Sequence, residues 1–482
     1  MSLPAAPPAS EALDVLSRFR VEFYESLYAR ADVLFELTDA VLCTDGPVKT
    51  LVELSLAHEM QRGHGALYAA LDKGWCEPAR MRRALADLPL PRVSDGRIAL
   101  AVDVSNWLRP DANTSPDRLF CHVHGRRADR SCDQLIPGWP YSFVAALESG
   151  RTSWCALLDA VRLGPADDAT TVTAAQLREV VTRIIAAGHW RGGDPDMLIV
   201  MDAGYDSAYL SHALADLPVV LVGRLRSDRV MLRDAGPARS GPRGGRPRKH
   251  GGVLTFAKPE SWHTPEVTTV TDTTRYGKAE AMAWDRMHPR LTHRGPWLEH
   301  AAEELPLLHG TLIRLTVERL PGEAAPKPVW LWCSATGAAP ADVDLWWRTF
   351  LRRFDIEHTF RMIKQTLGWT APRVRHPATA DLWTWLIIAA HTQLRLARPL
   401  TEDLRHPWER PVKTERLSPA RVRRGFRNLS RKAARPTAAP KPGKPGPGRP
   451  PGSRNQHKAR IQDVGKTVKR AETIKEHEQQ RG

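Results

Sequence analysis

Two short apolar segments of this chain each end in an aspartate. Residues 98–103 (IALAVD) and 197–202 (MLIVMD) have the length and composition of buried β-strands, and a helical stretch, residues 174–187, lies between them. Buried strands joined through a helix are typical of α/β proteins. The sequence therefore predicts a mixed sheet flanked by helices, with Asp103 and Asp202 at or near the ends of two of its strands.

The segments around these strands divide the chain further. Residues 141–147, 152–161 and 219–224 fit additional strands of the same sheet, and residues 11–88 are helical throughout, with no strand expected. Residues 48–58 and 65–71 fit either a small helical DNA-binding unit or a plain bundle. At 482 residues the chain is longer than a single hydrophobic core usually supports, so we expect more than one domain.

We expect five regions that differ in composition and in hydrophobic pattern. They are a helical N-terminal domain at 1–92, the first part of the mixed-sheet core at 93–223, a β-rich insertion at 224–335, helices that complete the core at 336–400, and a basic tail rich in Pro and Gly at 401–482. From about residue 431 this tail has almost no large apolar side chains, which predicts disorder.

Positive charge favours a polyanionic partner. The formal net charge is +16, and residues 431–482 hold 14 Lys and Arg against 4 Asp and Glu. Nucleic acid is the leading partner because basic side chains release counterions from phosphates. The N-terminus lacks the pattern of a signal peptide, and the apolar run at 382–390 is too short to span a bilayer, so we expect a cytoplasmic, nucleoid-associated protein with no membrane partner.

Six scattered cysteines without a CxxC pair argue against disulfides and against a structural zinc site. Cys121, His122 and His124 lie close together in the sequence, but a recognised four-ligand spacing is missing.

A third carboxylate, Glu357, lies in a predicted helix. Two strand aspartates and a helical glutamate offer the oxygen ligands that Mg²⁺ or Mn²⁺ prefers, and two such ions can support an in-line displacement at a phosphodiester. Taken singly, each acid also fits a helix cap, a turn or a solvated helix face.

The segment 350–369 (FLRRFDIEHTFRMIKQTLGW) resembles the YREK signature of bacterial insertion-sequence transposases of the DDE type. Arg353, Glu357 and Lys364 match its spacing, and Phe350 stands where the family usually has Tyr, which keeps the ring and loses the hydroxyl. These spacings return to nearly one face of a single helix. A salt-bridged surface helix is the competing explanation, and interleaved apolar residues weaken it.

The resemblance implies a ribonuclease-H-like core whose catalytic and metal-binding residues are Asp103, Asp202 and Glu357, with Asp206 as the main rival for the second position. It implies two divalent ions, Mg²⁺ or Mn²⁺, and DNA contacts from Phe350, Arg353 and Lys364. It also implies binding of transposon inverted repeats and target DNA by a homodimer, and cut-and-paste transposition. A tryptophan of the insertion stacks on a flipped base in some relatives; the candidates, each of which also fits a core position, are Trp262, Trp284 and Trp297.

Two basic stretches are further DNA-contact candidates. Arg246, Arg248 and Lys249 lie in one, and Arg449 lies in the other. Both resemble the Arg-Pro core of AT-hooks, although generic phosphate binding explains them equally well. The competing functions are a ribonuclease-H-like endonuclease that does not join strands, and a domesticated DNA-binding protein without catalytic activity.

Overall fold

The computed structural model describes residues 9–127, 130–150, 152–235, 249–300, 302, 304–320, 325–441 and 458–465. The chain begins with five helices and two very short strands: α1 (Ala9–Glu25), β1 (Leu27–Ala29), α2 (Ala31–Cys43), α3 (Leu51–Ser55), α4 (His64–Lys73), β2 (Trp75–Cys76) and α5 (Pro78–Ala86). The helical N-terminal region is confirmed, except that β1 and β2 pair where no strand was expected.

The middle of the chain supplies the first part of the sheet and two helices. These elements are β3 (Ala99–Leu108), β4 (Leu119–Arg127), β5 (Arg130–Leu147), β6 (Cys155–Arg162), α6 (Ala169–Ala186), β7 (Met197–Met201), α7 (Ser207–Ala213) and β8 (Val219–Leu225). All the strands expected from sequence in this part are present, and β4 is an addition. The strand β3 continues past Asp103, whereas β7 ends one residue before Asp202.

The insertion consists of short strands with two 3₁₀ turns. These are β9 (Val230–Leu232), β10 (Val253–Thr255), η1 (Pro259–Ser261), β11 (Val267–Thr273), β12 (Gly277–Met287), η2 (Gly295–His300), β13 (Gly310–Val317) and β14 (Val329–Cys333). Most of them do not form a separate sheet. Strand β14 pairs antiparallel with β8, so β11 to β14 extend the sheet of the core, and only β9 and β10 pair apart from it.

In the described residues the main sheet has ten strands, in the order β11-β12-β13-β14-β8-β7-β3-β5-β4, with β6 also on β5. Strands β3, β7 and β8 run parallel, and the other neighbours are antiparallel. A mixed sheet flanked by helices is the ribonuclease-H-like arrangement expected from sequence.

Six helical segments follow the sheet. They are α8 (Pro340–Arg352), α9 (Phe354–Gln365), α10 (Pro377–Ala397), η3 (Arg398–Leu400), η4 (Thr414–Arg416) and α11 (Pro419–Ser430). The prediction of one helix carrying Arg353, Glu357 and Lys364 is wrong in detail, because α8 ends and α9 begins at Arg353. Backbone bonds from Arg353 to Phe350 and from Ile356 to Arg353 span three residues instead of four, which tightens the chain at this junction.

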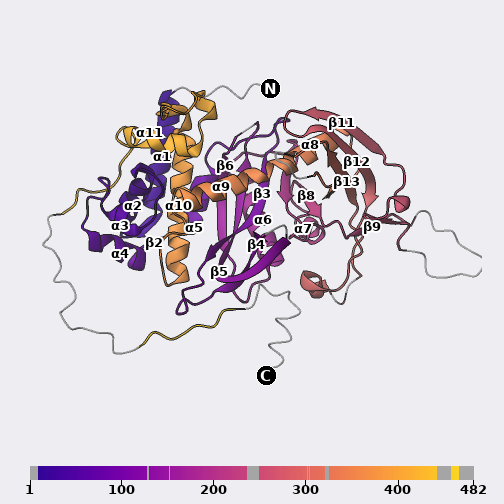
Figure 1. Cartoon of the computed structure of the whole chain (residues 1–482), viewed down its shortest axis with the longest axis horizontal. Coiled ribbons are helices and arrows are strands. Elements are labelled where there is room, and N and C mark those ends of the chain that lie inside the picture. The colour runs from indigo at the N-terminus through magenta and orange to yellow at the C-terminus, as the bar shows by residue number, and fades with distance from the viewer. Residues whose placement is uncertain are drawn as a thin grey trace, which may run out of the picture.

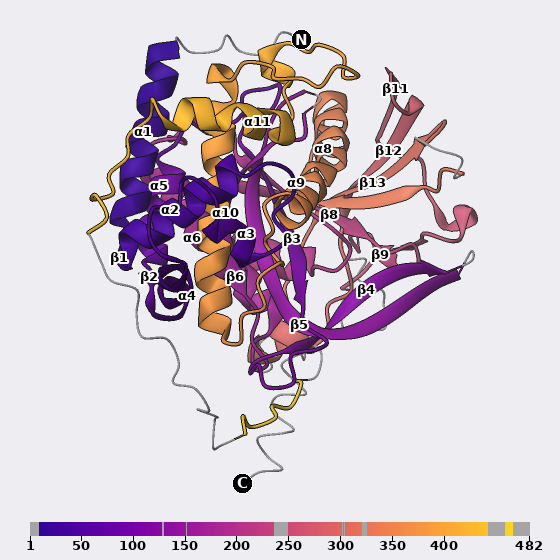
Figure 2. The same cartoon turned by 60° about the vertical axis from the view of Figure 1, so that its left-hand side comes forward.

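Helix α10 runs between the N-terminal helices and the sheet (Figures 1 and 2). All its residues from Leu382 to Leu394 are buried, because α1 and α2 cover one side and β6 the other. The apolar run that sequence analysis assigned to a buried helix is therefore the central helix of the core. No helix in the described ranges is long and apolar enough to cross a membrane.

Helix α11 was not expected, since residues 401–482 were predicted to be a tail. Its apolar face, including Val422 and Phe426, packs against α2 and α10, and Arg423 donates to the carbonyl of Val41 at 2.9 Å. The segment that follows also contacts the N-terminal helices, because the carbonyl of Ala434 accepts a 2.7 Å bond from Arg20. The first part of the predicted tail thus completes the N-terminal helical unit.

Candidate active site

The alternation of side chains along β3 and β7 determines which face carries the acids. Ala99 and Ala101 belong to the hydrophobic core on the α9 and α10 side, and Leu100 and Val102 belong to the core on the α6 side. Asp103 continues the first series, since side chains two apart on a strand share a face. Asp103 is therefore directed toward the helices.

The same rule places Asp202 beside Asp103. Ala101 pairs with Val200 across the parallel β3 and β7, and each aspartate follows its strand partner by two positions. Val200 also lies on the α9 and α10 side of the sheet. The two carboxylates, distant in sequence, are thus neighbours on one face.

Arg353 joins these aspartates to Glu357. Its guanidinium group lies 2.8 Å from Asp103 Oδ2, 3.4 Å from Asp202 Oδ2 and 3.2 Å from Glu357 Oε1. The side chain of Arg353 is only 3% exposed, whereas that of Glu357 is 49% exposed. The three acids therefore surround one buried cation and face solvent on the Glu357 side.

The position of Arg353 differs from its expected role. Phosphate contact was predicted, but the guanidinium is buried among the three carboxylates. Phe350 was also expected to contact DNA, yet it is 2% exposed and extends from α8 into the hydrophobic core of the protein. Both predictions are corrected for the same reason: at the junction of α8 and α9 these side chains point inward.

Burial acts strongly on Asp103. It raises the pKa of this carboxyl to about 6, although the charge of Arg353 opposes the shift. The positive charge of Arg353 is therefore too little to offset the cost of burying the Asp103 carboxylate, and an additional cation would stabilise its charged form. Carboxylate oxygens of Asp103, Asp202 and Glu357 are the ligand type that Mg²⁺ or Mn²⁺ prefers, and in this structure the guanidinium of Arg353 lies among them.

Arg224 is a site residue that sequence analysis did not identify. Its Nη1 atom lies 3.5 Å from Asp202 Oδ1, and its side chain is about half exposed. Val222 of β8 pairs with Val200 of β7, so Arg224 aligns with Asp202 on the same face. The sequence carries a signal for this residue, because Arg224 ends a predicted strand as the two aspartates do.

Lys364 lies near the C-terminal end of α9, beyond Glu357. Its ammonium group is 5.5 Å from the centre of the Trp369 ring, and burial lowers the pKa of Lys364. Asp206, the rival acid, has a different role: it is the N-cap of α7 and accepts a 3.0 Å bond from the backbone N–H of Tyr209.

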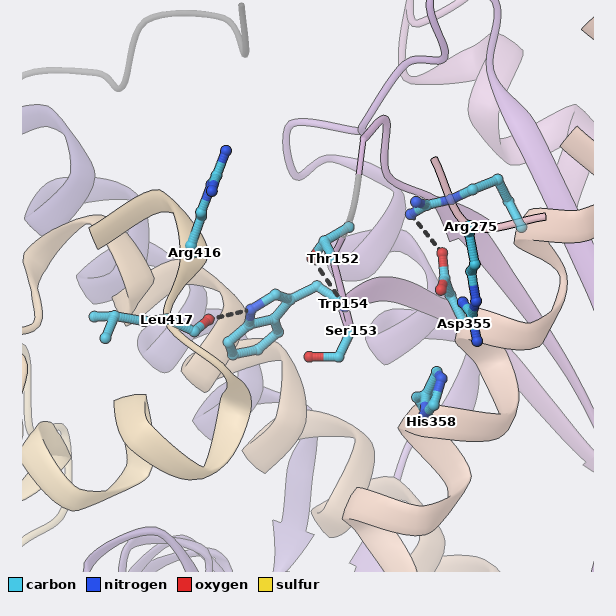
Figure 3. A pocket seen from close by; sticks show the side chains of 9 residues that line it. Thr152, Ser153, Trp154, Arg275, Asp355, His358, Arg416 and Leu417 are labelled. Atoms are coloured by element: carbon cyan, nitrogen blue, oxygen red, sulfur yellow. Dashed lines mark hydrogen bonds and ion pairs between the residues drawn. The ribbon is translucent and has the colours of Figure 1, made fainter. Parts of the chain in front are cut away.

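A pocket borders α9 on the side of Asp355, two positions from Glu357 and so on a different face of the helix. Figure 3 shows Asp355 and His358 extending from α9 toward it, with Arg416 and Trp154 across the opening. Arg275 and Arg352 complete its basic lining. Within this pocket Arg352 is paired with Asp355 of α9.

The tryptophans predicted to stack on a base are core residues in this structure. Trp284 and Trp297 are buried, which corrects their predicted role because neither ring offers a free face. Trp262 is partly buried; it donates to the carbonyl of Thr255 at 2.9 Å, and the guanidinium of Arg314 lies 5.0 Å from its ring centre. It belongs to the same aromatic cluster as Trp284.

The basic stretches are only partly described. Lys249 Nζ lies 2.9 Å from Glu304 Oε1 and donates to the carbonyl of Leu305, so it is engaged within the insertion. Arg246, Arg248 and Arg449 lie outside the described residues. Of the suggested cysteine and histidine group, Cys121 is buried and His122 is exposed, as alternation along β4 requires.

Comparison with known proteins identifies the family. A family model described as DDE superfamily endonuclease matches residues 22–290, more than half of the chain and a range that includes Asp103 and Asp202. No curated protein matches. Enzymes of this superfamily generally use divalent metal ions and act on DNA. Because the match covers more than half of its length, this chain belongs to the DDE superfamily of endonucleases.

Proposed function

We propose that this protein is a DNA transposase that binds the inverted repeats of its element, cuts the strands there and joins them to target DNA. The observation that carries the proposal is the convergence of Asp103, Asp202 and Glu357 on Arg353. The resemblance of residues 350–369 to the transposase signature supports strand transfer as well as cleavage.

The three carboxylates would hold two divalent ions, Mg²⁺ or Mn²⁺. When bound, these ions activate the attacking oxygen and stabilise the leaving oxygen of an in-line displacement. Asp103 and Asp202 are fixed by the sheet, whereas Glu357 is on a helix and more exposed. This arrangement gives a rigid pair of ligands and a third one at the opening through which DNA would approach.

The protein's own cations would have separate tasks. Arg353 orients all three carboxylates and offsets part of their repulsion, because its guanidinium donates to each of them. Arg224 and the basic pocket beside α9 would contact the DNA backbone, since their charges are accessible. Lys364 would position a phosphate near the acids.

The reaction has two steps of the same type. In cleavage, water attacks phosphorus, the P–O3′ bond breaks and the leaving oxygen takes a proton, which leaves a 3′-hydroxyl on the element's end. In joining, that 3′-hydroxyl attacks a target phosphodiester, and one P–O bond forms as another breaks. One site therefore serves both steps. A homodimer that pairs the two ends would explain how both are joined to one target.

The experiment that tests this function supplies labelled DNA taken from the flanks of the gene, together with a circular target and Mg²⁺ or Mn²⁺. Cleaved ends and branched or inserted products are expected from the wild type, and Glu357→Gln should yield neither while still binding the ends. Cleavage without joining would instead identify an endonuclease. Binding without cleavage in the wild type would identify a DNA-binding protein without catalytic activity.

A further inference from the structure

Four strand ends of the insertion meet away from the catalytic acids. Asp234 follows β9, His250 precedes β10, His288 follows β12 and His309 precedes β13. Backbone hydrogen bonds in both directions between Leu232 and His288 join the small β9–β10 pair to the main sheet at this point. The fold thus gathers three imidazoles and a carboxylate at one junction.

At this junction the side-chain atoms that could bind a metal ion lie close together. Ligand atoms of Asp234, His288 and His309 all lie within 4.8 Å of one another. His250 Nδ1 lies 3.1 Å from His288 Nε2, and His309 Nε2 lies against Asp234 Oδ1. The ligand atoms of Asp234, His288 and His309 are therefore close enough to share one small cation, and His250 lies beside His288.

Hydrogen bonding within the protein does not satisfy this group. His288 is 0% exposed, yet its Nδ1 atom has no hydrogen-bond partner among the described residues. His309 Nε2, although it touches Asp234, also lacks a hydrogen bond of acceptable geometry there. Buried imidazole nitrogens without partners are costly, and a bound metal ion removes that cost.

We propose that Asp234, His288 and His309 form a zinc site that fastens the β9–β10 pair to the main sheet, with water as the fourth ligand and His250 hydrogen-bonded to the far ring nitrogen of His288. Two imidazole nitrogens and one carboxylate oxygen suit Zn²⁺, which binds N and O ligands tetrahedrally and takes water at an open position; Mg²⁺ prefers oxygen alone. Arg286 Nε lies 2.7 Å from Asp234 Oδ2 and holds the carboxylate so that its other oxygen faces the histidines.

This site has no part in the transposition chemistry proposed above. Its ligands come from the insertion, whereas the acids come from β3, β7 and α9. A structural role follows from its position, because each ligand belongs to the end of a different strand. The zinc site and the transposase function can therefore be tested separately.

The test uses the full chain purified without a polyhistidine tag and dialysed against excess Mg²⁺, so that the catalytic acids do not retain zinc. Elemental analysis of the wild type should give one zinc per chain. Replacement by Co²⁺ should give the intense visible absorption of a tetrahedral site. A wild type that retains no zinc, with a Co²⁺ spectrum of the hydrated ion only, would overturn the proposal.

Variants locate the ion. His288→Gln and Asp234→Asn should lose the bound zinc and the zinc-dependent rise in Tm. His263→Gln is the matched control, because His263 is in the same insertion but faces Glu266, with 3.8 Å between Nε2 and Oε1. It should keep one zinc, as should Glu357→Gln.

Folding of each variant is checked by circular dichroism. If His288→Gln does not fold, Asp234→Asn decides the matter, because the Asp234 side chain is partly exposed and asparagine has the same shape. A folded Asp234→Asn protein with unchanged zinc content and affinity would show that the four residues form a hydrogen-bonded chain instead of a metal site.

Discussion

Arg353 Nη1 lies 2.8 Å from Asp103 Oδ2, and the guanidinium of this ion pair is buried at the centre of the acid cluster. Removal of the arginine leaves three carboxylates facing one another with their main countercharge gone. Loss of one partner from a buried ion pair costs about 3 to 5 kcal/mol. Arg353→Met should therefore unfold at a markedly lower temperature than the wild type in metal-free buffer.

A divalent ion should partly restore this variant. The added cation supplies the charge that Arg353 provided, so Mg²⁺ should raise the Tm of Arg353→Met by more than it raises that of the wild type. The measurement is thermal unfolding against Mg²⁺ concentration for both proteins. Equal Mg²⁺ effects in the two would contradict the view that Arg353 balances the charge of the metal-binding acids.

The raised pKa of Asp103 predicts opposite pH trends for stability and activity. Its folded pKa of about 6 lies above that of an exposed aspartate, about 4. Between these values the folded chain binds more protons than the unfolded chain, so this residue's contribution to stability falls as pH rises. The Tm of metal-free wild type relative to Asp103→Asn should decrease through this window.

Cleavage should change in the other direction. Metal binding requires the ionised carboxylate, so the rate should fall as pH drops through about 6, and more Mg²⁺ should move the midpoint to lower pH. Rates measured at two Mg²⁺ concentrations across this range check the prediction. A midpoint independent of Mg²⁺ would show that proton and metal do not compete at Asp103.

Arg224 is expected to contact DNA. Arg224→Ala should weaken binding and reduce the slope of log affinity against log salt by about one, as for loss of one phosphate contact. Arg226→Ala is the control, because Arg226 follows β8, is exposed and pairs with Asp228 at 3.0 Å. Equal losses of affinity in the two variants would indicate general charge effects and not a specific contact by Arg224.

The N-terminal helices depend on a buried ion pair of their own. Arg20 donates to both carboxylate oxygens of Asp39, at 2.8 and 2.9 Å, and to Gln393 of α10. Asp39→Ala leaves the arginine buried without its partner and should cost about 3 to 5 kcal/mol of unfolding free energy.

The control is an ion pair on the surface of the protein. Arg178 and Asp216 also form an ion pair, at 2.6 Å, but both side chains are largely accessible to water. Asp216→Ala should leave the Tm nearly unchanged, because solvent screens such pairs. Similar unfolding curves for Asp39→Ala and Asp216→Ala would show that the Arg20–Asp39 pair does not hold the helices together.

The strands that carry the aspartates could be predicted because they are short, apolar and buried on both faces. The same reasoning could not recognise that β14 pairs with β8, since pairing between distant strands leaves no local pattern. Helix α11 was missed because Arg and Pro dominate its surroundings; its buried face depends on contacts with α2 and α10.

Prediction of the candidate site was uneven for a similar reason. Motif spacing identified Glu357 and Arg353 together, but it implied that Arg353 and Phe350 face DNA. The break between α8 and α9 falls at Arg353, where the sequence has neither glycine nor proline to signal it, and both side chains are buried. Trp284 shows the same limit, because its burial depends on neighbours such as Trp330 of β14.

The most direct test of the acid cluster compares Glu357→Gln with Asp206→Asn in metal-dependent cleavage of labelled end DNA. Asparagine is as good an N-cap as aspartate, so the Asp206→Asn control should still cap α7 and keep wild-type activity. Glu357→Gln should lose most of its cleavage rate while its DNA affinity is retained, since a proposed metal ligand is removed. Cleavage by Glu357→Gln at a rate near that of Asp206→Asn would contradict the assignment of Asp103, Asp202 and Glu357 as the catalytic site.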